Sequence, residues 1–439
     1  MKLPIRGSLI VGTTLILSSA AMFARDATVA YRFGRNELVD SLLLALIPIN
    51  QLSLIVGPLL MPMLVPFFLR GTLPEQRRFI RRALLTSTGV ATGIAILVYA
   101  WSPAILSALG TRLSPAAVAS AVSQLRFLSV AIILSAASNV WWAALVARER
   151  LILPNLGAAI PSLCAVALLL TGPESLGIWA VSAGVLIGSA VMCIAGFVAV
   201  RRLYGADEAA SVRATETRPS SDPLPGYLGV LKLCGLAGGT SAASILGNFA
   251  EQGFAMRVGS GSVSAINYAN RIPTFLYGLG TAITASVLLP RFARSAAARK
   301  LSARLEFRQA ATVAFALTAV LSIAVFSLST PLVLLIFGRG QFHAADAEVV
   351  GAIQRVYVLS LPFWVAGMVG ARILQAHAAN RVILWITVVQ YLIDFVVCWI
   401  ASPRLGASGI ALGYLSMSVA YLCMVAGAVR ILAPRWNSP

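Results

Sequence analysis

The sequence is poor in acidic residues and in charge altogether. Of its 439 residues, 15 are Asp or Glu and 2 are His, and charged residues make up 11% of the chain, whereas a soluble globular domain carries about 25%. Hydrophobic residues make up 59%. The shortage of charge excludes a soluble enzyme, a disordered chain and a secreted disulfide scaffold, and it leaves an all-α membrane protein with several spans.

Sequence motifs of catalysis are absent as well. The chain contains no HExxH, no GxxxxGK[ST] and no GxSxG, and its few acids form no cluster that could bind a catalytic metal or act as an acid–base pair. Its five cysteines lie far apart, in or at the edges of apolar runs, and their spacing is not that of metal ligands. We therefore expect no enzymatic activity, no cofactor and no metal site.

Positive charge is what the chain does have, with a net charge of +19. The basic residues lie in short loops between apolar runs, where they set membrane topology, and not on one water-facing surface that would bind nucleic acid. Of the 34 Lys and Arg residues, 23 fall in loops on the side of the N-terminus and 10 on the other side. This bias predicts that both termini are cytoplasmic and that the number of spans is even.

Twelve apolar runs are long enough, or nearly so, to cross a bilayer as helices, which takes about 20 residues each. The one long polar stretch is rich in Ala, Ser, Thr, Pro and mixed charge and lies near the middle of the chain. The sequence thus predicts an N-terminal six-helix bundle (1–202), a cytoplasmic linker (203–225) and a C-terminal six-helix bundle (226–439). The runs are approximately 8–24, 42–69, 83–108, 126–147, 152–172, 176–200, 227–249, 272–290, 309–337, 356–379, 382–400 and 409–432.

The two halves match weakly when the chain is aligned with itself at an offset of 225 residues. Asp26 then meets Glu251, Arg32 meets Arg257 and Pro48 meets Pro273. Because each half has six spans, the halves share one orientation, which predicts a parallel internal repeat about an axis along the membrane normal. Substrate sites of such proteins usually lie at the interface of the repeats.

Charged residues within or beside the spans are costly and mark candidate sites. Arg25 and Asp26 end the first run, Asp40 opens the second and Arg271 opens the eighth. We expect Arg25 and Arg271 to face a shared aqueous cavity between the bundles, where their guanidinium groups would bind a phosphorylated amphiphile. The alternative is that these are interfacial residues, with Arg25 paired to Asp26.

Asp394 is the one acid inside a well-defined apolar run. Three states are open for a carboxyl group in such a place: it is neutralised, it pairs with an arginine, or it binds a coupling ion. We therefore name Asp394 as an ion-coupling or structural residue.

Four segments resemble the MurJ/MviN family of lipid II flippases, within the superfamily of multidrug, oligosaccharidyl-lipid and polysaccharide exporters. They cover most of the chain in the right order. These are FARDATVAYRFG (23–34) together with Asp40, GSVSAINYANRI (261–272) with the GLGTAITASVLLPRFARSAA that follows (278–297), LIFGRGQFHAADA (335–347) and PRLGASGIALGYLSMSVAYL (403–422).

The resemblance implies a flippase of the cell inner membrane that moves an undecaprenyl-diphosphate-linked glycan between leaflets by alternating access. Its partners would be this lipid-linked substrate and membrane lipids, and we expect a monomer that binds no nucleic acid. By motif, the charged residues that line the cavity in the family correspond to Arg25, Asp40 and Arg271. The neighbouring Asp26, Asn50 and Asn270 complete the predicted substrate-binding set.

The chain departs from the family pattern at three points. Asn270 stands where the family usually has Asp, and IPINQLSL (47–54) has Asn50 and Gln51 but no arginine where the family has a basic cluster. The family usually has fourteen helices, whereas twelve are expected in this chain. A flippase for an exopolysaccharide or O-antigen unit is therefore an alternative, and a cation-coupled multidrug exporter of the same architecture is another.

Overall fold

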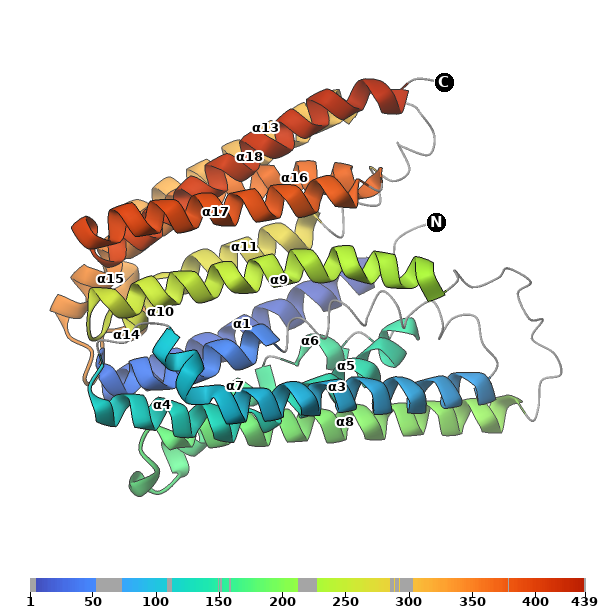
Figure 1. Cartoon of the computed structure of the whole chain (residues 1–439), viewed down its shortest axis with the longest axis horizontal. Helices are drawn as coiled ribbons and strands as arrows, with labels where there is room; N and C mark the ends of the chain where they lie inside the picture. The colour runs from blue at the N-terminus through green and yellow to red at the C-terminus, as the bar shows by residue number, and fades with distance from the viewer. Residues whose placement is uncertain are drawn as a thin grey trace. The chain divides into compact units, whose positions relative to one another are not determined.

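The fold is known from a computed structural model of the chain, and its described part is helical throughout, without strands (Figure 1). This confirms the all-α class. The residues described are 5–52, 73–108, 113–148, 150, 152–157, 159–211, 227–284, 288, 292, 303–377 and 379–437. The end of the second apolar run, with Pro58, Pro62 and Pro66, lies outside these residues.

The chain divides into two compact units. Unit 1 comprises Met1–Val29, Ser41–Ser107 and Pro115–Gly238, and unit 2 comprises Ala30–Asp40, Ala108–Ser114 and Gly239–Pro439. Two short segments of the first half, 30–40 and 108–114, thus belong with the second half of the chain. The predicted bundle boundaries stay a prediction.

Unit 1 is built from helices of the first half. The helices are α1 (Ile5–Phe33, whose last four residues belong to unit 2), α3 (Leu73–Ala108), α4 (Pro115–Leu128), α5 (Val130–Ala147), α6 (Ile152–Asn155), α7 (Ala159–Thr171), the short 3-10 helix η1 (Glu174–Leu176) and α8 (Trp179–Ser211). Helices α5 and α7 both pack against α8. Gly184 and Gly188, one turn apart on α8, allow the close approach of α7, because a Cβ at either would collide with the backbone at Ala165 or Pro161.

Unit 2 contains the remaining helices. Helix α9 (Tyr227–Val258) belongs to unit 2 from Gly239 onward. The other helices are α10 (Ser262–Ala269), α11 (Arg271–Ile283), α13 (Ala303–Ser327), α14 (Ser329–Phe337), α15 (Ala344–Leu359), α16 (Leu361–Ala376), α17 (Asn380–Leu405) and α18 (Ala407–Asn437). Helix α18 packs against α15, α16 and α17, and α13 packs against α16. Ile373, Val425 and Val429 lie in the core between α16 and α18.

Seven helices or helix pairs in the described part are long and apolar enough to cross a membrane. The twelve spans and the internal repeat stay predictions. Two of the seven begin well before the predicted apolar run: Pro115–Ala147 before 126, and Ala344–Ala376 before 356. Polar residues lower the hydropathy of these starts: the buried Gln124 in the first, and the buried Gln354 with Asp346 and the exposed Glu348 in the second.

Helix α8 continues to Ser211, within the range 203–225 predicted as a linker, and the linker stays a prediction. Residues 212–226 lie outside the described part.

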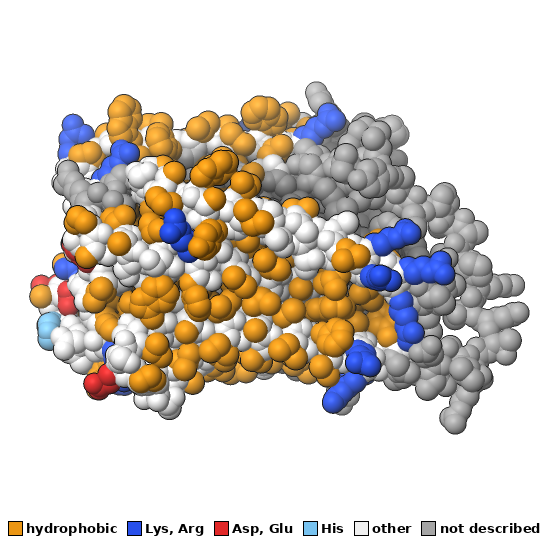
Figure 2. All heavy atoms as spheres, turned by 60° about the horizontal axis from the view of Figure 1, so that its bottom comes forward, with side chains coloured by type: hydrophobic (Ala, Val, Ile, Leu, Met, Phe, Trp, Pro, Cys, Tyr) orange, Lys and Arg blue, Asp and Glu red, His pale blue; other side chains and the backbone are white. Residues whose placement is uncertain are grey.

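The face of unit 1 in Figure 2 shows hydrophobic side chains over the middle of the helices and Lys and Arg side chains at one end. Exposed apolar residues such as Leu85 and Ile96 of α3 and Ile194 of α8 form the hydrophobic part. Arg77, Arg81 and Arg201, all exposed, lie on the ends of the same helices. An apolar belt with a basic end is the pattern of a surface that faces lipid and meets a membrane boundary.

Candidate functional site

Arg25 and Asp26 form an ion pair on α1 in unit 1. The Nε and Nη2 atoms of Arg25 donate hydrogen bonds of 3.1 and 3.0 Å to Oδ1 of Asp26. The side chains are 12% and 7% exposed, so both charges are removed from water. A buried charge is tolerated in a membrane helix when a partner neutralises it, and these two residues neutralise each other.

Asp40 is fully buried in unit 2 and holds the start of α10. Its Oδ2 accepts a hydrogen bond of 2.6 Å from the N–H of Gly261, and its Oδ1 accepts one of 2.8 Å from the N–H of Ser264. Gly261 is the residue before the helix, in the left-handed conformation with φ of 76°, so it offers no side chain for capping. Asp40 supplies this cap from 221 residues away. Burial raises the pKa of Asp40, and the hydrogen bonds from Ser264 and Gly261 oppose that shift.

The segment before Asp40 is held to unit 2 by further contacts. Nε of Arg35 lies 2.9 Å from Oδ1 of Asp346, and the N–H of Gln341 donates to the carbonyl oxygen of Tyr31 at 2.9 Å. Tyr268 of α10 also donates to the carbonyl oxygen of Gly34. These contacts explain why residues 30–40 belong to unit 2 although α1 begins in unit 1.

Arg271 is the first residue of α11, as the sequence predicts. The residue before it, Asn270, has the right-handed helical conformation, and its N–H donates to the carbonyl oxygen of Ile266 at 2.9 Å. Helix α10 therefore runs almost continuously into α11, and the N–H of Asn270 is not free to bind an anion. Arg271 is half-buried, and Oδ1 of Asn270 is buried without a hydrogen-bond partner in the described part.

Asn50 is exposed near the end of the described helical residues 37–52 in unit 1. The predicted site residues are thus distributed over both units: Arg25, Asp26 and Asn50 lie in unit 1, and Asp40, Asn270, Arg271 and Asp394 lie in unit 2. The shared cavity expected around Arg25 and Arg271 would join residues of different units, and it stays a prediction.

Asp394 lies on α17 beside a second buried acid, Glu251 of α9, and the two carboxyl groups interact electrostatically. They are 3% and 7% exposed. Tyr357 of α15 donates a hydrogen bond of 2.6 Å to Oε1 of Glu251, and Sγ of Cys398 donates to Oδ1 of Asp394 at 3.5 Å. Gly413 of α18 makes room for this group, because a Cβ there would come within 2.6 Å of Oδ1 of Asp394.

The partners of these two acids are neutral. In the described part of unit 2 neither acid forms an ion pair, so the arginine that was one possible partner of Asp394 is not found. The aromatic ring of Tyr414 packs against the ring of Tyr357 with centroids 5.6 Å apart, and Tyr357 is fully buried. We call Glu251, Tyr357, Asp394 and Cys398 the acid cluster. No group of three or more His, Cys, Asp or Glu suited to a metal is present among the described residues.

Sequence reasoning found Asp394 but not the rest of the acid cluster. The one signal for Glu251 is that it matches Asp26 in the predicted repeat. No spacing rule connects Tyr357 with Glu251, because 106 residues separate them.

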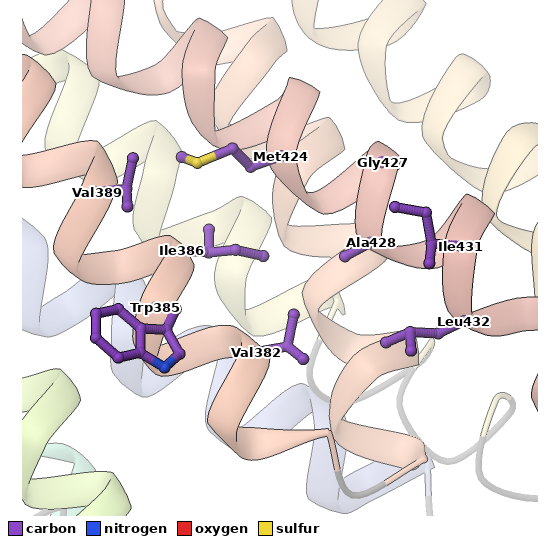
Figure 3. A pocket seen from close by; sticks show the side chains of 9 residues that line it. All are labelled: Val382, Trp385, Ile386, Val389, Met424, Gly427, Ala428, Ile431 and Leu432. Atoms are coloured by element: carbon purple, nitrogen blue, oxygen red, sulfur yellow. The ribbon is translucent and has the colours of Figure 1, made fainter.

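A shallow groove between α17 and α18 has an apolar lining and a volume of about 430 Å³ (Figure 3). Trp385 stands at its side, with 68% of the residue exposed. A groove of this chemistry fits hydrocarbon, and the indole N–H of Trp385 is the one polar side-chain group among its lining residues. Its lining residues are Val382, Trp385, Ile386, Val389, Met424, Gly427, Ala428, Ile431 and Leu432.

Comparison with protein families gives a match to the family described as lipid II flippase MurJ, over residues 29–438. A protein of Rhizobium meliloti (strain 1021) named as a probable lipid II flippase MurJ is 30% identical over 223 residues, which are 49% of this chain and 40% of the relative. A protein of Synechocystis with the same name is 23% identical over 382 residues, which are 84% of this chain and 70% of the relative. The chain thus aligns with less than half the length of the first of these relatives.

Solved structures share the fold. A lipid II flippase MurJ in an inward closed conformation superposes with a TM-score of 0.81 at 18% identity, and the match covers 96% of this chain and 87% of that one. A multidrug resistance transporter of the MATE family, in an inward-facing conformation, gives 0.65 at 13% identity, with 97% and 95% covered. At these identities the structural likeness concerns the fold alone.

Proposed function

The chain belongs to the MurJ family, and from this we propose that it translocates an undecaprenyl-diphosphate-linked glycan, lipid II or a close analogue, across the cell inner membrane by alternating access. The observation that carries the proposal is the family match over residues 29–438. Moving a lipid between leaflets requires binding and conformational change but no bond making, so the protein acts as a transporter and not as an enzyme.

The proposed site for the diphosphate is formed by arginine. A guanidinium group can bind two phosphate oxygens through parallel hydrogen bonds. In the structure Arg25 donates two hydrogen bonds, both to one carboxylate oxygen of Asp26. We propose that the diphosphate takes the place of Asp26 as the partner of Arg25 during transport, and that Arg271 provides a second contact.

The amide side chains of Asn50 and Asn270 would serve the glycan. Each amide offers two N–H donors and one acceptor oxygen, which suit hydroxyl and acetamido groups of sugars. Asn50 is exposed and Oδ1 of Asn270 lacks a partner in the described part, so both side chains have hydrogen-bonding capacity to spare.

Asp40 would act through the position of α10. While its two carboxylate oxygens accept the N–H groups of Gly261 and Ser264, it keeps the residues just before α11, and hence Arg271, in one place. A change of conformation that breaks these bonds would release α10 and free the carboxylate for the substrate, in line with the substrate-binding role expected from the sequence.

The acid cluster is the proposed coupling site. Two buried acids with neutral partners are costly to keep ionised, and binding a proton or a small cation lowers that cost because it compensates their negative charge. Transport coupled to this uptake should depend on pH or on Na⁺, and Asp394→Asn should remove that dependence. Transport by wild-type protein that responds to neither condition would contradict coupling at this site.

The orientation of the chain follows from the distribution of Lys and Arg, with 23 on one side of the membrane and 10 on the other. We propose that both termini are cytoplasmic. A reporter that works only in the cytoplasm should be active when it is fused to the C-terminus. Activity of a periplasm-specific reporter at the same position would contradict the topology.

The experiment that tests the function is a translocation assay in liposomes that contain the purified protein and one fluorescent lipid at a time. Lipid II should be translocated faster than an O-antigen-type lipid-linked oligosaccharide, and a cationic dye should not be exported against its gradient. Preference for the oligosaccharide would identify the polysaccharide flippase instead. The translocation rate in liposomes that contain the Asp40→Ala protein shows whether transport requires the contacts of Asp40 with the N–H groups at the start of α10.

A further inference from the structure

A second pocket, of about 550 Å³, lies in unit 2 between α11, α13 and α16. Most of its lining is aliphatic or aromatic, and its two threonines, Thr284 and Thr318, donate their hydroxyl groups to their own helices. Ile283, Val313 and Leu317 at its edge are 59%, 59% and 68% exposed. Large exposed aliphatic residues on a membrane helix face lipid, so this pocket opens toward the hydrocarbon of the bilayer.

One charged residue lines this pocket. Glu306, in the first turn of α13, is only 8% exposed. Its carboxylate forms no ion pair or hydrogen bond with the residues that the structure describes. A carboxylate at the boundary of a lipid-facing pocket, with no partner among the described residues, is costly unless a cation reaches it. Gln309, three residues along α13, lies on the same face and also lines the pocket.

Glu306 lies at the depth in the membrane where lipid headgroups lie. Arg304 and Arg308, both exposed, flank it in the first turns of α13, and basic residues at the end of a membrane helix lie at the membrane surface. From Ala310 to Leu321 the lining of α13 is apolar except for Thr318. At 1.5 Å per residue this stretch is about 16 Å long, close to one leaflet of a hydrocarbon core of about 30 Å.

From this geometry we propose that the pocket binds a bulk phospholipid with a primary ammonium headgroup, of the phosphatidylethanolamine type. One acyl chain fills the slot between α11, α13 and α16, and the ammonium group pairs with Glu306. The amide of Gln309 donates to the phosphate beside it. An anionic lipid would bring its charge next to a carboxylate, and the diphosphate of the proposed transport substrate would do so even more. The site is therefore separate from the translocated lipid and does not depend on the proposed function.

The test uses the purified full-length chain in nanodiscs that contain equal amounts of phosphatidylethanolamine and phosphatidylglycerol, each with a photoreactive acyl chain. Labelled peptides from α11, α13 and α16 are quantified for each lipid. The ethanolamine lipid should label the pocket about tenfold more, the lower end expected for one charge-assisted hydrogen bond. Equal labelling by both lipids in the wild-type protein would overturn the proposal without any variant.

Two variants and one control separate the headgroup contact from the slot. Glu306→Gln should remove the lipid preference while labelling of the slot continues, and Glu348→Gln, an exposed acid on α15, should retain the preference. Ala314→Trp should lower labelling by both lipids, because the indole fills the slot. A preference that persists in Glu306→Gln would overturn the role of the carboxylate, and unchanged labelling in Ala314→Trp would overturn the slot.

Discussion

Asp26 and Glu251 occupy matching positions in the predicted repeat, and both are buried in a helix. Their partners differ. Asp26 lies beside an arginine and forms an ion pair with it, whereas Glu251 accepts a hydrogen bond from the phenol of Tyr357 and has a second acid, Asp394, near it. The partner, more than the acid itself, therefore determines what each position can do. Beside Asp26 lies an arginine that can bind a phosphate, and at Glu251 lies negative charge that a cation can neutralise.

Breaking the ion pair should have the largest effect on stability. Arg25→Ala leaves the Asp26 carboxylate buried without its arginine, which costs about 3–5 kcal/mol for a buried pair. The double variant Arg25→Ala/Asp26→Ala should lose less than the single one, because no buried charge remains. Equilibrium unfolding in mixed micelles measures both, and Arg32→Ala on the same helix is the control. A loss below about 0.5 kcal/mol, the usual range for surface changes, would contradict the pairing.

Removing the phenol hydroxyl of Tyr357 tests the position of Glu251 in the comparison. Tyr357→Phe keeps the ring and its packing on Tyr414 but removes the hydrogen bond to Glu251. The expected loss in unfolding free energy is about 1.5–3 kcal/mol if Glu251 is ionised and about 0.5–1.5 kcal/mol if it is neutral, so the magnitude reports the charge state. Tyr99→Phe, at an exposed tyrosine, is the matched control. Equal stability of Tyr357→Phe and wild type would show that the hydrogen bond contributes nothing.

A smaller effect than the loss of the ion pair is expected at the cap of α10. Asp40→Asn retains one acceptor oxygen and loses the negative charge, and losing a helix cap costs about 0.5–2 kcal/mol. Faster hydrogen exchange at the amides of Gly261 and Ser264 should accompany this loss. Glu348→Gln, at an exposed acid, serves as the control for removing a negative charge. Unchanged exchange at both amides would mean that Asp40 does not hold the helix start.

Charge and hydropathy predicted the class of the protein and the start of α11 at Arg271, and short motifs predicted its family, because each depends on local sequence. The starts of the spans at Pro115 and Ala344 were missed, since polar residues, including two acids after Ala344, lower their hydropathy. The partners of Asp40 and Glu251 could not be predicted either. Their contacts join residues 221 and 106 positions apart, and a sequence without aligned relatives contains no signal for such pairs.

The boundary between the two units, which falls inside α1, could not be predicted from the sequence either. The helix continues without a break from Ile5 to Phe33, and the sequence there reads as one apolar run with a charged end. Only the contacts of Tyr31, Arg35 and Asp40 with residues beyond 260 assign its last turn to unit 2.

The central claim is that arginine recognises the diphosphate of the transported lipid. The direct measurement is the translocation rate per folded molecule, in liposomes, of a polyprenyl-diphosphate lipid and of its monophosphate analogue by wild type, Arg271→Ala and Arg271→Lys. Wild type should prefer the diphosphate, and Arg271→Ala should reduce its transport about ten- to a hundredfold, as expected for one charge-assisted contact of about 1.5–3 kcal/mol. Arg271→Lys should recover only part of the rate, because lysine keeps the charge but not the planar fork. Wild-type rates in Arg271→Ala at normal protein level would contradict the claim.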